Sequence, residues 1–306
     1  MGNSNLAEEA ISLARITIAN WLDGNNAGII ARLQSKPVVF PVFGGSLVEG
    51  LMTCGSDLDF CMLMDNHGKR QDMGRLQLGF KRSMSKLDDQ LKQLGLRGLC
   101  RISRRIRNAN EFLELYRCHE SRAAMMRTGV KLNYILSCRL LDIETDEIKS
   151  SVRLAAEPEL LRLKKRLYRS YCKTVGYSYI PILPYLLKRP SSYTPRRVIT
   201  QVQLAVNNIL LATYGIDAIS GTLDAKISRV VDIAERERTS MERDVTKDDM
   251  NTAIDLIRNI KCRASADKSL HQKSLHHLIS KGDVQKAEWE CVRRLTEYLL
   301  GLAKHM

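Results

Sequence analysis

The chain has 306 residues, of which 44% are hydrophobic and 27% are charged. This is the composition of a folded globular protein and excludes a collagen-like or disordered chain. No apolar run approaches the roughly 18–20 residues that a bilayer-spanning helix needs, and residues 1–10 lack the basic segment and apolar stretch of a secretory signal. We therefore expect a cytoplasmic protein without a membrane anchor.

The chain is strongly basic, because 48 Lys and Arg against 34 Asp and Glu give a net charge of +14. Such a charge favours anionic partners, including RNA, nucleotides and acidic protein surfaces. Part of the excess lies in two runs, 97–107 and 162–169. For each run, a solvated helix face is an equally good interpretation.

The cysteines and histidines do not predict a structural metal. The eight cysteines are scattered without a C-x-x-C pair, and the six histidines form no ligand motif. Reduced and mostly buried thiols are the expected state.

The first third of the chain predicts one helix and two strands. Apolar residues recur at helical spacing over 7–22. Residues 38–43 form a β-branched and aromatic run that is too short for a helix and predicts a buried strand. This strand ends at the glycine pair 44–45, and the apolar segment 58–64 predicts a second strand beside it.

Most of the remaining chain has a helical pattern. An amphipathic stretch covers 73–94, and alternating apolar residues give a weaker prediction of a third strand over 100–106. From residue 108 onward, apolar residues recur at steps near four. Two prolines and several hydroxyl residues interrupt this pattern near 188–197 and predict a flexible loop, after which helices are expected over 198–210 and 289–299.

A glycine-rich turn follows the first predicted strand. Gly44 and Gly45 allow positive φ angles and a close approach of the backbone to a ligand. Ser46 and the neighbouring amides can donate hydrogen bonds to nucleotide phosphates. The turn alone is a weak signal, because similar turns are common on protein surfaces.

Two aspartates follow on the second predicted strand. Asp57 and Asp59 are two residues apart, so their carboxylates point to the same side of a strand, while Leu58 points into the core. Such a pair can hold Mg²⁺ or Mn²⁺. Two cations about 3.5–4 Å apart would activate an acceptor hydroxyl and neutralise a leaving pyrophosphate. Together, the turn and the carboxylate pair predict nucleotidyl transfer.

This pattern resembles the DNA polymerase β-like nucleotidyltransferase superfamily, whose signature is G-S, a glycine four residues after the serine, and then S-D-x-D. Ser46, Gly50 and Asp57 stand at that spacing, and residues 40–65 look especially like terminal uridylyl and poly(A) RNA polymerases. The resemblance implies a nucleoside triphosphate substrate. It also implies Asp57 and Asp59 as catalytic magnesium ligands, with Gly44, Gly45, Ser46 and Ser56 as nucleotide contacts.

One expected feature of that family has no clear counterpart. The family usually has a third carboxylate on a later strand, as the base that receives the acceptor proton. Glu114 is the best substitute, although its neighbours also fit an ordinary amphipathic-helix glutamate.

Over residues 70–220 the chain is faintly similar to bacterial PII-protein uridylyltransferases and their short relatives. Within this stretch Lys131 and Arg139 are candidates for phosphate binding, and helix capping is an equally good interpretation.

The resulting prediction is an α+β fold. A small mixed β-sheet of polymerase β-like type, flanked by helices, forms a catalytic domain over residues 1–150. A mostly α-helical domain over 151–306 binds the acceptor or covers the nucleotide.

Three functions remain open at this level. The first is transfer of a nucleoside monophosphate to a protein side chain, as the longer resemblance implies. The second is template-independent addition of nucleotides, uridylyl or adenylyl, to an RNA 3′ end; the local motif and the net charge favour it. The tyrosines among the cations of 162–185 suit an RNA track, and packing between helices is an equally good interpretation. The third is a catalytically silent module that binds nucleotides or RNA, which the missing third acid favours.

Overall fold

The computed structural model describes residues 3–23, 38–65, 71–109, 134–143, 153–175 and 195–236, with single residues and short stretches between 26 and 30 and between 251 and 299. The chain forms two compact units. The first unit contains residues 1–48 and 54–174, and the second contains residues 49–53 and 175–306. The chain therefore joins the second unit for a short segment between the glycine turn and the two aspartates.

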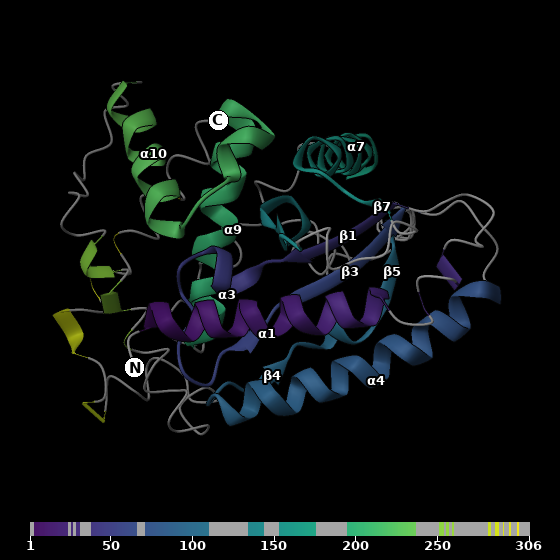
Figure 1. Cartoon of the computed structure of the whole chain (residues 1–306). Helices are drawn as coiled ribbons and strands as arrows, with labels where there is room; N and C mark the ends of the chain where they lie inside the picture. Colours follow the sequence, from purple (N-terminus) through teal and green to yellow (C-terminus); the bar gives the residue numbers. More distant parts are fainter. Residues whose placement is uncertain are drawn as a thin grey trace. The chain divides into compact units, whose positions relative to one another are not determined.

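The first unit is built on a mixed β-sheet (Figure 1). Its centre is an antiparallel pair in register from Val38↔Asp65 to Phe43↔Phe60. The strand order is β5-β3-β1-β6, with β7 also paired to β1; β5 runs parallel to β3, and β7 runs parallel to β1. The strands are β1 (Val38–Phe43), β3 (Phe60–Asp65), β5 (Ile106–Asn108), β6 (Arg139–Leu140) and β7 (Arg153–Leu154). The predicted α+β class with a small mixed sheet is confirmed.

The two central strands are buried on both faces. In β1, Val39 and Val42 are fully buried although they face opposite sides of the sheet, and residues 60–64 of β3 are buried without interruption. Runs of apolar residues without alternation are typical of strands covered on both sides. This explains why both strands could be recognised from composition.

The second predicted strand is interrupted at Asp59. Residues Asp57–Leu58 form β2, which pairs in parallel with β4 (Gly98–Leu99), while β3 starts only at Phe60. The buried Ser103 hydroxyl accepts a hydrogen bond from the Phe60 amide at 3.1 Å and donates one to the Leu58 carbonyl at 3.3 Å. These hydrogen bonds join the two residues that flank Asp59, where the chain passes from β2 to β3.

The predicted third strand over 100–106 is wrong as a single element. After β4, residues Arg101–Arg104 form a 3-10 helix, η1, and β5 begins at Ile106. The Ser103 amide bonds back to the Cys100 carbonyl at 3.1 Å, which closes the helical turn.

Two long helices of the first unit run side by side (Figure 1). They are α1 (Asn3–Asp23) and α4 (Gln71–Gln93), and they confirm the helices predicted over 7–22 and 73–94. Trp21 of α1 meets Phe80 of α4 edge to face, with ring centroids 5.2 Å apart. Each helix buries a row at steps of three or four residues: Leu6, Ala10, Ala14, Ile18 and Leu22 in α1, and Leu76, Phe80, Met84, Leu87 and Leu91 in α4.

A third helix of this unit, α7 (Glu157–Val175), follows β7. It buries Leu160, Leu163 and Leu167 on one side. Glu159 in the first turn accepts a hydrogen bond from the Ala156 amide at 3.0 Å, which satisfies a donor just before the helix.

The second unit is helical in the part that the structure describes. It contains α9 (Pro195–Tyr214), the 3-10 helix η4 (Ile216–Ile219) and α10 (Leu223–Arg236). The predicted loop near 188–197 is wrong at its end, because Pro195 is already the first residue of α9, a position that proline favours. Residues 188–194 and most of 289–299 lie outside the described residues.

Across the described ranges, no helix has the length and apolarity needed to cross a membrane.

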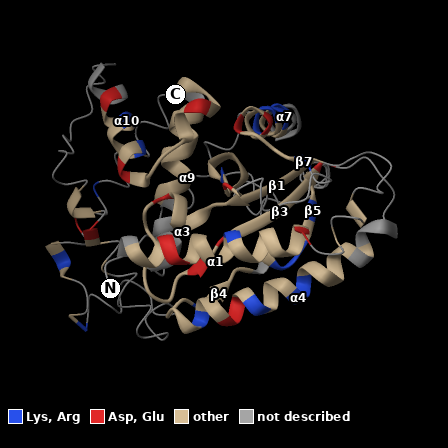
Figure 2. Ribbon diagram, viewed as in Figure 1, with Lys and Arg blue, Asp and Glu red and all other residues tan. Residues whose placement is uncertain are grey.

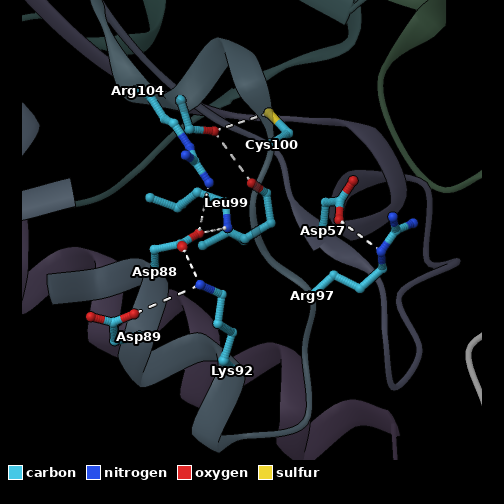
Figure 3. A network of polar contacts seen from close by, with 10 residues as sticks. Asp57, Asp88, Asp89, Lys92, Arg97, Leu99, Cys100 and Arg104 are labelled. Atoms are coloured by element: carbon cyan, nitrogen blue, oxygen red, sulfur yellow. Dashed lines mark hydrogen bonds and ion pairs between the residues drawn. The ribbon is translucent and has the colours of Figure 1, made fainter. Parts of the chain in front are cut away.

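A polar network connects α4 to β4 (Figure 3). Asp88 Oδ1 accepts a hydrogen bond from the Leu99 amide at 2.6 Å, and its Oδ2 pairs with Lys92 Nζ at 2.6 Å. Arg104 adds a longer ion pair of 3.5 Å. Burial alone would raise the pKa of Asp88, but the hydrogen bonds from Lys92 and Leu99 outweigh it and lower the pKa. Asp88 therefore supports the strand that pairs with Asp57–Leu58.

We predict that Asp88→Ala destabilises the fold, whereas Asp89→Ala does not. Removing Asp88 leaves the buried Leu99 amide without its acceptor, which costs about 1–3 kcal/mol. Asp89 is a matched control because it is on the same helix turn but is 75% exposed and 3.7 Å from Lys92. Chemical denaturation of both variants measures the difference, and equal loss of stability in both would contradict the role of Asp88.

The lowered pKa of Asp88 also predicts a pH dependence. Because the folded-state pKa lies below the unfolded value of about 3.9, the stabilisation is complete above that value and is lost as the pH falls through the folded-state pKa. The difference in unfolding free energy between the wild type and Asp88→Asn should therefore shrink on going from pH 7 to pH 3. A difference that stays constant over this range would contradict the assignment.

Candidate functional site

The glycine turn continues directly from β1. The Gly44 amide donates a hydrogen bond to the Asp59 carbonyl at 2.8 Å, one position beyond the Phe43↔Phe60 pair. At Gly45, with a positive φ of 58°, the chain enters the short helix α3 (Gly45–Val48). The turn and Asp59 are thus fixed to each other through the backbone.

Both glycines are required by close neighbours. A Cβ at Gly45 would overlap the carboxylate of Asp59, so this carboxylate lies directly against the turn. A Cβ at Gly44 would lie only 2.7 Å from Cε2 of Tyr134, whose ring packs against the turn. The positive φ adds a second constraint at Gly45, since side chains rarely adopt that conformation.

Asp57 and Asp59 flank a core residue. Leu58 is 1% exposed, while both aspartates are partly exposed, which is the alternation expected of an extended segment. Asp57 Oδ1 is 3.6 Å from Arg97 Nε (Figure 3). The Arg97 amide also donates to the Ser56 carbonyl at 3.0 Å, as part of the pairing between β2 and β4. Arg97 therefore places a positive charge next to Asp57.

Two protonated side chains lie near Asp59. Burial raises the pKa of the Cys100 thiol to about 12, and the Asp59 charge and a hydrogen bond to Asp59 act with it. Burial also raises the pKa of Tyr134 well above its ordinary value, with further contributions from Cys61 and Asp59. Both groups keep their protons at neutral pH, so neither adds a negative charge beside Asp59.

The donor chemistry of the site fits a hard divalent cation. Mg²⁺ is commonly bound by one or two carboxylates, with water and substrate phosphates as the other ligands. Asp57 and Asp59 supply such oxygens, and the Asp59 carboxylate lies directly against the glycine turn. No cluster of three or more His, Cys, Asp or Glu suited to a metal occurs among the described residues, and a site completed by triphosphate oxygens does not need one.

The other residues proposed from the sequence have different positions. Ser46 is partly exposed in α3, and Ser56 is buried immediately before β2. Arg139 is exposed on β6, where it pairs with Phe43, the residue before the glycines. Glu114 and Lys131 lie outside the described residues.

The described strands next to the site carry no third carboxylate. β5, the neighbour of β3, consists of Ile106, Arg107 and Asn108, and β4, β6 and β7 also lack Asp and Glu. Asp65 is at the opposite end of β3 from Asp59 and pairs with Arg166 at 3.2 Å. Within the part of the sheet that the structure describes, the candidate carboxylates are therefore Asp57 and Asp59.

Three neighbours of the aspartates were not proposed from the sequence. Arg97 was only one cation of a basic run, Cys100 was part of an uncertain strand, and Tyr134 was one apolar position of a helical pattern. Parallel pairing of β2 with β4 brings the first two to the site. Tyr134 comes from a separate segment of the chain, so its place beside Gly44 could be found only from the fold.

Comparison with known proteins agrees with this geometry. Residues 28–99 match the family model described as a nucleotidyltransferase domain. The matched stretch contains the glycine turn and both aspartates, and it is consistent with the polymerase β-like superfamily that the motif resembles. No curated protein matches the chain.

We predict that Gly45→Ala destabilises the protein more than Gly95→Ala does. Both glycines have a positive φ, 58° and 87°, and Gly95 ends α4 in a left-handed conformation, so both substitutions strain the backbone by about 1–2 kcal/mol. At Gly95 a Cβ would meet nothing within 4 Å, whereas at Gly45 it displaces the Asp59 side chain. Thermal unfolding compares the two variants. Equal losses would contradict the contact between Gly45 and Asp59.

Proposed function

We propose, from the premise that residues 28–99 are a nucleotidyltransferase domain, that the chain is a magnesium-dependent enzyme that moves a nucleoside monophosphate from a nucleoside triphosphate to an acceptor. The domain itself supports nucleoside monophosphate transfer in general. The observation that carries the finer proposal is the contact of the Asp59 carboxylate with Gly45. Metal-binding oxygens beside a phosphate-accepting turn are the arrangement that this transfer needs.

Each residue of the site has a physical task in this proposal. Gly44 and Gly45 let the turn pass close to the Tyr134 ring and the Asp59 carboxylate, and the amides that follow Gly44 donate to the triphosphate. Ser46, which is partly exposed, donates its hydroxyl to a phosphate oxygen. Asp57 and Asp59 hold Mg²⁺ or Mn²⁺ against the same phosphates, and Arg97 balances the Asp57 charge before substrate arrives. Ser56 fixes the start of β2 through the hydrogen bond from Arg97 to its carbonyl.

In the proposed reaction, an acceptor oxygen attacks the α-phosphorus of the triphosphate. The bond from the α-phosphorus to the bridging oxygen breaks, pyrophosphate leaves, and the acceptor hydroxyl gives up its proton. Bound divalent cations would lower the pKa of this hydroxyl and offset the charge on pyrophosphate. Glu114 is our candidate base for the proton, and Lys131 and Arg139 are candidate phosphate ligands.

Our first candidate acceptor is a protein side chain, and the second is an RNA 3′ end. The similarity of residues 70–220 to PII-protein uridylyltransferases supports a protein acceptor. The basic helix α7 supports RNA: Lys and Arg gather on it in Figure 2, and Arg162, Arg166 and Arg169 are exposed at steps of four and three residues, on one face. Such a face attracts a phosphate backbone.

The proposal also includes the domain organisation and the cellular location. We propose a polymerase β-like catalytic domain over residues 1–150 and a helical domain over residues 151–306 that binds the acceptor or covers the nucleotide. We propose the cytoplasm as the site of action.

The variant Asp57→Asn with Asp59→Asn should lose transfer by about 10³-fold or more, because each cation would lose its protein ligands and several kcal/mol of transition-state stabilisation. The assay incubates the protein, Mg²⁺ and each α-labelled nucleoside triphosphate with RNA and with a protein extract. Label on protein or on RNA identifies the acceptor.

Asp89→Asn is the control, since it removes an exposed carboxylate outside the site. It should retain full transfer, and circular dichroism should show that the double variant keeps its fold. Wild-type protein that labels nothing would support a silent binding module instead. Undiminished labelling by the double variant would contradict the proposed metal ligands.

A further inference from the structure

A buried ion pair lies within the second unit. Lys226 of α10 is fully buried, and its Nζ is 2.6 Å from Oε1 of Glu49, whose side chain is 4% exposed. These residues are 177 positions apart in sequence. A lysine without solvent contact requires a partner of opposite charge, so the carboxylate of Glu49 is what makes the position of Lys226 tolerable.

The backbone of Glu49 is held by the same turn of α10. The Leu223 amide, the first of the helix, donates to the Glu49 carbonyl at 3.1 Å. The next residue, Gly50, has a positive φ of 67°, and a Cβ there would lie 3.2 Å from Cγ2 of Thr222. Side chain and main chain of residues 49–50 therefore dock together on the start of α10.

The position of Glu49 along the chain is significant. Glu49 comes three residues after Ser46 and eight residues before Asp57. It starts the segment 49–53, which belongs to the same unit as α10, while the residues on either side of the segment belong to the other unit. Along the chain, Leu47 and Val48 are the residues between Ser46 of the glycine turn and Glu49.

We propose that Glu49 and Lys226 form a positioning pair that sets the end of the phosphate-binding turn. Any shift of Glu49 on α10 is carried through two residues to Ser46. The pair touches no substrate; it acts through the backbone of α3. This inference rests on the proposed function for the identity of the ligand, which is the triphosphate of the nucleotide.

A buried ion pair fits positioning better than simple stabilisation. Its attraction is largely offset by the cost of removing two charges from water, and apolar residues of similar size often give equal stability. Its two charges, however, have only one favourable arrangement in an apolar interior. An apolar pair would hold the helix without fixing the register of residue 49.

The experiment separates the two roles with Glu49→Leu combined with Lys226→Met. We expect this double variant to unfold at a temperature close to that of the wild type. We also expect amide hydrogen exchange in peptides covering residues 44–58 to be at least about 10-fold faster. The dissociation constant for α,β-methylene ATP and α,β-methylene UTP with Mg²⁺ should rise by about 10-fold or more, with a smaller effect on kcat than on KM.

Arg229→Met is the matched control. Arg229 is one turn along α10 and donates to the carbonyls of Ala218 and Ser220, so its removal takes from the same helix two hydrogen bonds that do not involve residues 49–53. It should leave exchange in residues 44–58 unchanged. Glu49→Gln combined with Lys226→Met, which leaves no unpaired buried charge, provides the same exchange measurement if the first double variant does not fold.

Exchange in residues 44–58 that stays at the wild-type rate in both double variants would overturn the inference, as would an equal effect of Arg229→Met. Faster exchange in the pair variants with none in the control supports it. The hydrogen-exchange readout does not depend on the proposed function. Wild-type protein that neither binds the analogues nor transfers nucleotides would contradict that function. Hydrogen exchange would still decide whether the Glu49–Lys226 pair positions the turn.

Discussion

The contact between Gly45 and Asp59 is the constraint on which the site depends. It exists because β1 and β3 pair in one register, so that the chain leaves β1 beside the residue that precedes β3. The positive φ of Gly45 then turns the backbone over the carboxylate. A shift of one residue in this register would turn Asp59 to the other face of the sheet. The proposed reaction thus depends on the pairing of β1 with β3, which buried apolar residues make.

The surroundings of the aspartates divide into charged and neutral sides. Asp57 faces the cation of Arg97, which is supported by the pairing of β2 with β4 and, behind it, by Asp88. Asp59 instead has a neutral thiol and a neutral phenol near it. With no third carboxylate on the described neighbouring strands, the site carries less negative charge than a three-acid site. In the proposed mechanism, two carboxylates, the triphosphate and water would then supply the metal ligands.

The sequence predicted the features that depend on local residue patterns. Burial on both faces made β1 and β3 recognisable from composition, amphipathic periodicity predicted α1 and α4, and the motif spacing placed Gly45 and Asp59 in one site. Long-range pairing could not be predicted: β2, β4, β6 and β7 have two residues each, too few for a periodic signal. The Ser103 hydroxyl bonds to both residues that flank Asp59 and comes from more than 40 positions away. The pairing of Glu49 with Lys226 spans 177 positions and has no local signature.

The most direct test of the central claim is to locate the bound metal. Fe²⁺ in place of Mg²⁺, with ascorbate, peroxide and a non-hydrolysable nucleoside triphosphate analogue, cleaves the backbone next to the metal, and mass spectrometry of the fragments identifies the positions. If Asp57 and Asp59 hold the cation against the glycine turn, cuts will occur at both 44–46 and 57–59 and will disappear with excess Mg²⁺. Cuts confined to one of these segments, or placed elsewhere in the chain, would contradict a metal site between them.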